Sequence, residues 1–301
     1  MKELLKELHT YKLGKIVEHV PLKEHTTYRV GGTADAFIYP KTATDLVKIM
    51  KLIKTYQVPY FVLGKGSNVL FSDRPFHGLI VKLDELDEVK IRGQIVTVGA
   101  GYSLMKLSSL VARKGLSGLE FASGIPGSVG GAIYMNAGAY KKDMGYIVTK
   151  VKVLTPSGRI ISMVNRELNF HYRSSFFQQH KDYIVLEATL KLQQGVKEEI
   201  LALMQERKER RLETQPLEYP SAGSVFRNPE NQYAGKLIED IGLKGLTRGG
   251  AMISPKHANF IVNIGNATSQ DIKDLMDLVK VTVKDNYHID LKVEQELVNW
   301  E

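Results

Sequence analysis

Residues 115–139 read GLSGLEFASGIPGSVGGAIYMNAGA, and this stretch is the most informative part of the chain. Seven of its 25 residues are glycine, against 26 glycines in all 301 residues. Glycine has no Cβ, so a run of this kind lets the backbone approach something flat or highly charged. We therefore expect a long functional loop inside one domain. Ordinary turns in a glycine-rich domain are the alternative.

A second short glycine loop, GKGSN at residues 64–68, follows the apolar run 60–63. Upstream, residues 36–39 are expected to form a strand, and Thr42 with Asp45 resembles a helix-capping box. These segments predict a β-α-β unit whose second strand opens into the glycine loop, and ligand loops belong at such carboxyl ends of strands. Two anion-binding loops on one chain indicate a large phosphorylated cofactor.

The hydrophobic pattern predicts mixed α and β structure in three regions, at residues 1–82, 83–205 and 206–301. The last strand is expected to rejoin the first region. Expected strands, beyond those already named, are 89–98, 148–164 around a turn at 156–158, 259–263 and 289–298. Expected helices are 1–20, 103–114, 196–212, 233–241 and 268–287.

Composition is ordinary for a soluble globular protein, with 43% apolar and 25% charged residues. The sequence has no long uncharged apolar run, so no transmembrane helix is predicted. The mixed charges at the N-terminus are unlike a signal peptide. The chain has no cysteine, which excludes disulfides and thiolate metal sites and fits a reducing cytoplasm.

The net charge of +8 is compatible with nucleic acid, a membrane surface or an anionic small molecule as partner. The densest basic run, RKERR at residues 207–211, contains a glutamate and is interpreted as a solvated helix face. No nucleic-acid-binding module with base-stacking aromatic residues is visible.

Several familiar signatures are absent. Gly99-Ala100-Gly101 lacks the third glycine of a dinucleotide fingerprint, and neither glycine loop is a P-loop. No GxSxG nucleophile elbow is present. The eight histidines show no metal-ligand spacing, so no metal site is predicted.

Three polar groups occupy unusual positions. Arg173 follows Tyr172 after a turn-like segment, and Ser224 follows a glycine at the start of an apolar pair. Glu294 and Glu296 are expected on the same face of a strand. Taken singly, each also fits an ordinary structural role as an exposed side chain, a cap or a solvated strand face.

Together these pieces resemble one family, the UDP-N-acetylenolpyruvoylglucosamine reductases. The resemblance covers residues 21–298 and is closest to the shorter subtype, which lacks an extra tyrosine-bearing loop over the substrate. It rests on seven segments in order: TTYRVGG at 26–32, GKGSN at 64–68, SGIPGSVGGA at 123–132, MNAGA at 135–139, YR at 172–173, AGSVFRNP at 222–229 and HANFIVN at 257–263.

The resemblance implies an α+β fold. It consists of an FAD-binding part of the vanillyl-alcohol-oxidase type and a C-terminal α+β substrate domain. FAD would be bound non-covalently, and NADPH would be the hydride donor. The substrate would be the enolpyruvyl ether of UDP-N-acetylglucosamine and the product UDP-N-acetylmuramate, a precursor of peptidoglycan. We expect a monomeric, cytoplasmic protein that binds no nucleic acid and does not enter the membrane.

By the same resemblance, the two glycine loops and their neighbours would hold FAD. Backbone N–H groups would cradle the pyrophosphate, and the hydroxyl and amide side chains could add hydrogen bonds. The expected cofactor-binding residues are Gly64, Lys65, Gly66, Ser67, Asn68, Gly124, Ile125, Pro126, Gly127, Ser128, Val129, Gly130, Gly131, Ala132, Asn136, Gly138, Ala139 and Val185. For Val185, a place in a core strand is an equal alternative.

The resemblance also implies three catalytic residues. Arg173 would hold the substrate carboxylate and Ser224 would donate the proton. Glu294 would lie near the same carboxylate, while a shifted alignment would choose Glu296 instead. Gln295 departs from the family, which commonly has an apolar residue there. Expected substrate contacts are Tyr172, Asn228 and Arg211.

Three other functions remain open on the sequence. Another FAD oxidoreductase of the same fold would keep the glycine loops but would not need Arg173, Ser224 and Glu294 together. A non-catalytic flavin-binding paralogue is compatible with the altered C-terminal tail. A nucleic-acid-binding protein would rest on the net charge alone.

Overall fold

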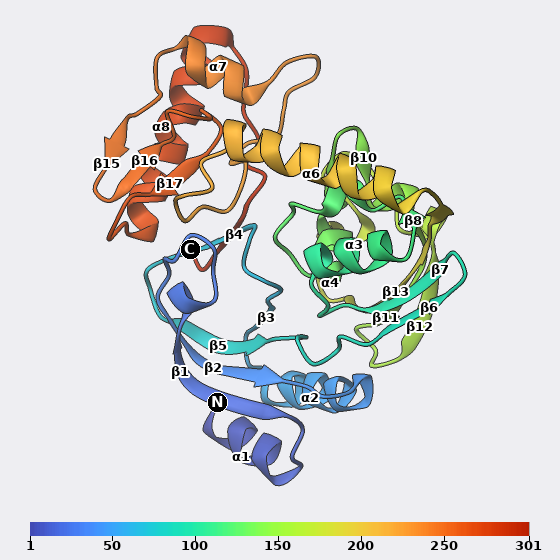
Figure 1. Cartoon of the computed structure of the whole chain (residues 1–301). Helices are drawn as coiled ribbons and strands as arrows, with labels where there is room; N and C mark the ends of the chain where they lie inside the picture. The colour runs from blue at the N-terminus through green and yellow to red at the C-terminus, as the bar shows by residue number, and fades with distance from the viewer. Residues whose placement is uncertain (301) are drawn as a thin grey trace. The chain divides into compact units, whose positions relative to one another are not determined.

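The computed structural model describes residues 1–300, and these form two compact units (Figure 1). Each unit is built from separated pieces of chain. Unit 1 comprises Met1–Glu18, Asp35–Lys65 and His77–Lys208, and unit 2 comprises His19–Ala34, Gly66–Phe76 and Glu209–Glu301. The division into three regions at residues 82 and 205 stays a prediction. Mixed helices and strands in both units confirm the α+β class.

The predicted β-α-β unit is present. Strand β2 (Thr33–Tyr39) leads into helix α2 (Ala43–Tyr56), and β3 (Tyr60–Val62) precedes the first glycine loop. Thr42 caps α2, because its Oγ1 accepts a 3.1 Å hydrogen bond from the backbone N–H of Asp45. The sheet order is β1-β2-β5-β3, with β1 at Lys15–Pro21 and β5 at Phe76–Val81. β3 and β5 run parallel, so both direct their carboxyl ends to the same edge.

A five-stranded antiparallel sheet forms the second layer of unit 1. Its order is β12 (Ile160–Val164), β11 (Val148–Leu154), β13 (Ile184–Lys191), β7 (Ile95–Gly99) and β6 (Val89–Arg92). The hairpin predicted at 148–164 is confirmed as β11–β12. The single strand expected at 89–98 is instead a hairpin, β6–β7, because Gly93, with a φ of +56°, turns the chain between them. β13, which sequence patterning left undecided, is the central strand. Helices α3 (Leu104–Arg113) and α4 (Val129–Met135) accompany this sheet, and α4 contacts β13 and β7.

Unit 2 has its own hydrophobic core, around helix α8 (Ser269–Tyr287) and α7 (Ala234–Asp240). The helices pack with a small antiparallel sheet of β15 (Thr247–Arg248), β16 (Ala251–Ile253) and β17 (Ile261–Asn263). The last strand, β18 (Glu296–Val298), pairs in parallel with β4 (Val69–Phe71) from far earlier in the sequence.

The remaining helices are α1 (Lys2–Thr10), α5 (Phe176–Gln179) and α6 (Lys197–Thr214), and the remaining strands are β8 (Leu116–Ser117), β9 (Gly138–Ala139), β10 (Lys142–Asp143) and β14 (Gln193–Gln194). Short 3-10 turns lie at Leu22–Glu24, Glu120–Ala122, Met144–Tyr146 and Asn165–Glu167. Within residues 1–300, no helix combines the length and the apolar character needed to cross a membrane.

Three further expectations about local structure were wrong. Residues 1–20 are not one helix: Gly14 has a φ of +142°, which a helix cannot accommodate, and β1 follows. The expected strand at 289–298 is reduced to β18, because Glu294 donates its backbone N–H to Val225 instead of to a strand. Residues 115–139 are not one loop, since Ser128 caps α4 within them.

Candidate active site

The two predicted glycine loops meet in unit 1. A Cβ on Gly64 would lie only 2.6 Å from Oγ of Ser128, so a side chain at position 64 would displace this hydroxyl. The same Ser128 Oγ accepts a 3.3 Å hydrogen bond from the N–H of Gly131 and so caps α4. The structure therefore brings the end of β3 next to the start of α4, as is needed if the two loops bind one ligand.

Several backbone N–H groups of these loops are not used by the protein itself. Within residues 1–300, the N–H groups of Gly64, Lys65, Gly124, Gly127 and Ser128 donate to no protein acceptor. Such groups bind phosphate oxygens well, because they bring partial positive charge without bulk. The loops of unit 1 thus suit the pyrophosphate of a dinucleotide such as FAD.

Lys82 lies directly beneath this loop and was not expected. Its side chain is only 4% exposed, and its Nζ donates to the carbonyl oxygen of Gly64. Burial lowers the pKa of Lys82, an effect that Asp84, 3.6 Å away, partly offsets. Lys65 also pairs with Asp84 at 2.8 Å. A lysine directly after the apolar strand GLIV was the sequence signal that could have revealed it.

Four further residues that were expected to bind the cofactor contact other parts of the protein. Gly130 packs against Ala100, where a Cβ would be 3.0 Å away. Gly66 packs against the backbone of His25 in unit 2 and has a φ of +67°. Val185 is buried in the hydrophobic core within β13, as its alternative interpretation proposed. Asn68, in unit 2, donates its Nδ2 to the carbonyl of Glu294 at 3.2 Å.

Arg173 lies at the tip of a tight turn. His171 and Ser174 exchange two backbone hydrogen bonds of 3.0 Å, which leaves Tyr172 and Arg173 between them. The guanidinium of Arg173 donates to the carbonyl of Gly138 at 2.9 Å and lies 5.2 Å from the ring of Tyr172. Tyr172 is 52% exposed. The structure thus brings three expected site residues together in unit 1.

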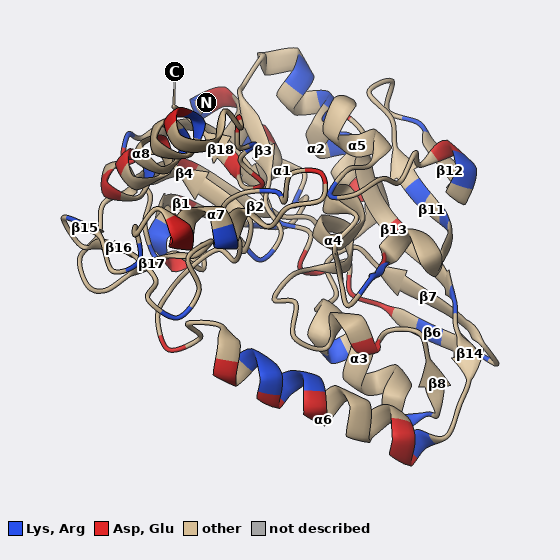
Figure 2. Ribbon diagram, turned by 90° about the horizontal axis from the view of Figure 1, so that it is seen from above, with Lys and Arg blue, Asp and Glu red and all other residues tan. Residues whose placement is uncertain are grey.

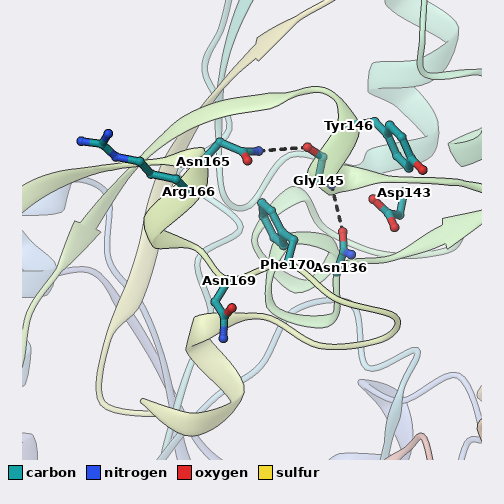
Figure 3. Close-up of a pocket in the computed structure, with 8 residues that line it drawn as sticks. All are labelled: Asn136, Asp143, Gly145, Tyr146, Asn165, Arg166, Asn169 and Phe170. Carbon is teal, nitrogen blue, oxygen red and sulfur yellow. Dashed lines mark hydrogen bonds between the residues drawn. The ribbon is translucent and has the colours of Figure 1, made fainter.

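A polar cavity of about 430 Å³ lies near this turn, since Asn136, which lines it (Figure 3), donates its Nδ2 to the carbonyl of His171 at 2.9 Å. Asn136 and Asn165 lie on it, and both bind the backbone of Gly145. Phe170 faces the cavity among polar neighbours (Figure 3). The lining residues are Asn136, Asp143, Gly145, Tyr146, Asn165, Arg166, Asn169 and Phe170.

Ser224 and Glu294 are neighbours in unit 2. The N–H of Glu294 donates to the carbonyl of Val225 at 2.8 Å, and Phe226 forms an isolated bridge with Val293. Both side chains are half-buried. Glu296 instead lies in β18, where its N–H binds the carbonyl of Asn68 at 2.9 Å. The residue bonded to the serine segment is therefore Glu294.

Gln295 organises this part of unit 2. It is 4% exposed, and its Nε2 approaches the carbonyl oxygens of Ala222, Gly223 and Ser224 at 3.2, 3.4 and 3.5 Å. Its Oε1 accepts a hydrogen bond from the buried hydroxyl of Tyr28. The amide at a position where the family commonly has an apolar residue thus supports the loop that carries Ser224.

The expected substrate contacts in unit 2 have structural partners. Asn228 Oδ1 accepts a 3.1 Å hydrogen bond from the N–H of Ala234 at the start of α7. Arg211 donates from Nε to Gln215 at 3.0 Å. Basic and acidic residues are interspersed along α6, as Figure 2 shows. Within residues 1–300, no group of three or more His, Cys, Asp or Glu side chains could hold a metal ion.

Two family models match the chain. The FAD binding domain model covers residues 34–163, which include both loops of unit 1. The model of the UDP-N-acetylenolpyruvoylglucosamine reductase C-terminal domain covers residues 215–298, which include Ser224 and Glu294. A glucose dehydrogenase, Phl p 4.0202, shares the fold over 65% of this chain and 44% of its own, with a TM-score of 0.51 and 15% identity.

Full-length relatives carry the same name. The UDP-N-acetylenolpyruvoylglucosamine reductases of Anoxybacillus flavithermus and Bacillus subtilis are 49% and 46% identical, each over 99% of both chains. The crystal structure of the reductase from Thermus caldophilus has a TM-score of 0.80 and 38% identity, over 94% of this chain and 98% of its own. Since these relatives match both units along nearly their whole length, the chain belongs to the UDP-N-acetylenolpyruvoylglucosamine reductase family.

Proposed function

We propose that this protein reduces the enolpyruvyl ether of UDP-N-acetylglucosamine to UDP-N-acetylmuramate with NADPH. It is an FAD-containing oxidoreductase of peptidoglycan precursor synthesis. Full-length relatives that bear the name of this activity support the reaction, and the match to the FAD binding domain supports the cofactor. The roles of single residues below are derived from their chemistry and surroundings.

The loops of unit 1 hold the pyrophosphate of FAD. The N–H groups of Gly64, Lys65, Gly124, Gly127 and Ser128 are the donors that the protein leaves unused. The FAD cofactor, when bound, takes hydride from NADPH and supplies it to the substrate alkene. Lys82 holds the carbonyl of Gly64 away from the phosphates and adds positive charge below the loop.

Hydride addition to one alkene carbon leaves an electron pair on the neighbouring carbon, delocalised into the carboxylate. Arg173 stabilises this charge, because a guanidinium can hold a carboxylate through two parallel N–H donors. Its bond to Gly138 fixes the direction in which the guanidinium points. Tyr172, on the same turn, contacts the substrate beside it.

Ser224 donates the proton that completes the reduction at carbon. A serine hydroxyl is a weak acid, so this step requires a strongly basic carbanion as acceptor and charged neighbours. Glu294, beside the serine segment, shares a proton with the substrate carboxylate, since an ionised glutamate would repel it. Asn228 and Arg211 contact the nucleotide part of the substrate.

One observation carries this assignment: the 2.8 Å hydrogen bond between Glu294 N–H and Val225 carbonyl. It joins the segment of Glu294 to that of Ser224, two groups that the reaction needs together. We further propose a monomer in the cytoplasm, with functional regions at residues 1–82, 83–205 and 206–301.

The test is a stopped-flow experiment on the purified protein. It should be yellow, release intact flavin in acid, and show flavin bleaching by NADPH followed by reoxidation by the enolpyruvyl substrate under anaerobic conditions. A folded protein that takes up no FAD would overturn the cofactor assignment. A flavoprotein that NADPH reduces but this substrate does not reoxidise would belong to a different oxidoreductase or to a non-catalytic paralogue.

A further inference from the structure

The backbone of Arg173 is held in a conformation that it would not adopt alone. Its φ is +52°, in the left-handed region that residues with a Cβ rarely occupy. Such a conformation persists only where the surroundings enforce it. The reciprocal bonds of His171 and Ser174 close the turn and use the N–H of Ser174, but they leave the carbonyl oxygen of Arg173 to other partners.

Gln178 in α5 provides one of these partners. Its Nε2 donates to the carbonyl oxygen of Arg173 at 2.9 Å. The same Nε2 lies 3.3 Å from the carbonyl of Tyr134 and 3.4 Å from the sulfur of Met135, both in the last turn of α4. One side-chain amide therefore ties the carbonyl of Arg173 to the end of α4.

Asn136 provides the second. Its Nδ2 donates to the carbonyl of His171 at 2.9 Å, and its Oδ1 accepts from the N–H of Gly145 at 2.9 Å (Figure 3). The side chain is 1% exposed, so both ends of its amide are committed inside the protein. Asn136 therefore links the turn to residue 145 through its side chain, and its expected contact with the cofactor stays a prediction.

We propose that Gln178 and Asn136 are positioning residues for Arg173. They fix the backbone on both sides of the turn tip, and the bond to Gly138 fixes the guanidinium, so Arg173 meets the substrate carboxylate at a constant angle. This inference rests on the proposed function. It concerns two side chains that hydrogen-bond to the backbone around the turn.

Gln178→Ala tests the inference, with Gln179→Ala as the matched control. Gln179 is the next residue of the same short helix, and its side chain is exposed. Misplacement of a catalytic group by about 1 Å can cost on the order of a hundredfold in rate. In the FAD-loaded protein, we expect Gln178→Ala to slow reoxidation by enolpyruvyl substrate by about tenfold to a hundredfold. Flavin reduction by NADPH should stay within about twofold of wild type.

Ligand affinity gives a second readout that is independent of turnover. By calorimetry, Gln178→Ala should bind UDP-N-acetylmuramate about tenfold more weakly, because this ligand carries the carboxylate that Arg173 holds. Binding of UDP-N-acetylglucosamine, which lacks the carboxylate, should be unchanged. Equal weakening of both ligands, or of neither, would overturn the proposal. Gln178→Met, which keeps the side-chain length without the donor, should behave like alanine and guards against a packing defect.

A double-mutant cycle completes the test. If Gln178 acts through Arg173, Gln178→Ala should have little further effect on reoxidation in an Arg173→Ala background. The same fold-loss in both backgrounds would show that Gln178 acts elsewhere and would contradict the inference. Failure of the proposed function is distinguishable, since wild-type protein would then bind neither nucleotide and would not be reoxidised by the enolpyruvyl substrate.

Discussion

The hydroxyl of Tyr28 donates a 3.1 Å hydrogen bond to Oε1 of Gln295, and both side chains are buried in unit 2. Burial raises the pKa of Tyr28 well above its ordinary value, so the phenol stays neutral and remains a donor. The other end of the Gln295 amide faces the carbonyls of residues 222–224. Tyr28, Gln295 and the serine loop thus form one buried polar network.

Gln295→Leu should destabilise the protein, although leucine resembles the apolar residue that is common in the family. The substitution leaves the buried Tyr28 hydroxyl without its acceptor, at a cost of about 1–3 kcal/mol in the free energy of unfolding. Adding Tyr28→Phe should recover part of the loss, because both ends of the bond are then apolar. Urea unfolding of the single and double variants measures this. A double variant with a lower free energy of unfolding than the Gln295→Leu single variant would contradict this expectation.

Gly64→Ala should weaken FAD binding. Its methyl group would lie 2.6 Å from Oγ of Ser128, so that hydroxyl must turn away and lose its cap bond with the N–H of Gly131. We expect a loss of at least about tenfold in FAD affinity, measured by flavin fluorescence on apoprotein. Gly93→Ala is the control for backbone strain: a Cβ there approaches no atom within 4 Å, but its φ of +56° disfavours alanine, so stability should fall while FAD affinity is unchanged. Unchanged FAD affinity in Gly64→Ala would show that the close contact between Gly64 and Ser128 is not needed for cofactor binding.

Lys82→Met should change how stability depends on pH. Burial lowers the folded-state pKa of Lys82, so above that pKa the unfolded chain binds more protons than the folded one. Wild-type stability therefore gains a contribution as pH rises toward the unfolded value of about 10.4, and Lys82→Met lacks this gain. The stability of the variant relative to wild type should fall between pH 7 and pH 10, as measured by urea unfolding. A constant difference would show that Lys82 keeps its ordinary pKa.

Arg173→Lys should separate the two half-reactions. Lysine keeps the positive charge but cannot hold a carboxylate through two parallel donors. NADPH should reduce the flavin of this variant normally, while the enolpyruvyl substrate should reoxidise it slowly. If stopped-flow traces showed both steps slowed equally, Arg173 would instead be a structural or cofactor-facing residue.

Ser224→Ala should leave folding, flavin content and flavin reduction intact. Reoxidation by substrate should slow by about a hundredfold to ten-thousandfold, the range for loss of a general acid. Ser224→Cys should recover part of the rate, because a thiol can also give up a proton. If Ser224 only supports a turn, alanine would instead cost about 1 kcal/mol of stability and little activity. Stopped-flow reoxidation traces decide between the two.

Local sequence signals predicted much of the fold. The Thr42 cap, the strand before Gly64 and the hairpin at 148–164 depend on neighbouring residues, and the structure confirms them. The pairing of β18 with β4 agrees with the expectation that the last strand rejoins residues 1–82, but no local pattern identified β4 as the partner, because the two segments are distant in sequence. The prediction of a strand over 289–298 was wrong for a similar reason. Glu294 donates its N–H to Val225, which is distant in sequence and which no local pattern identifies as a partner.

The candidate site was predicted by motif, not by physical pattern. Ser224, Glu294 and Arg173 were found because their segments resemble a family, and their individual roles stay predictions. The residues that support them were missed. The side chains of Lys82, Asn136 and Gln178 donate to backbone carbonyls that are distant in sequence or lie in irregular turns. Such bonds leave little trace in the sequence.

Unit 2 is built from segments that are separated in the sequence, and this limits the order in which they can fold. Its early pieces, His19–Ala34 and Gly66–Phe76, leave the ribosome long before Glu209–Glu301. β4 must therefore wait for β18, which is synthesised much later. Contacts between such distant segments close slowly, because a large loop must be ordered first. A variant that lacks β18 would thus leave β4 exposed as an unpaired edge, and the nascent protein would need protection from aggregation until β18 has emerged.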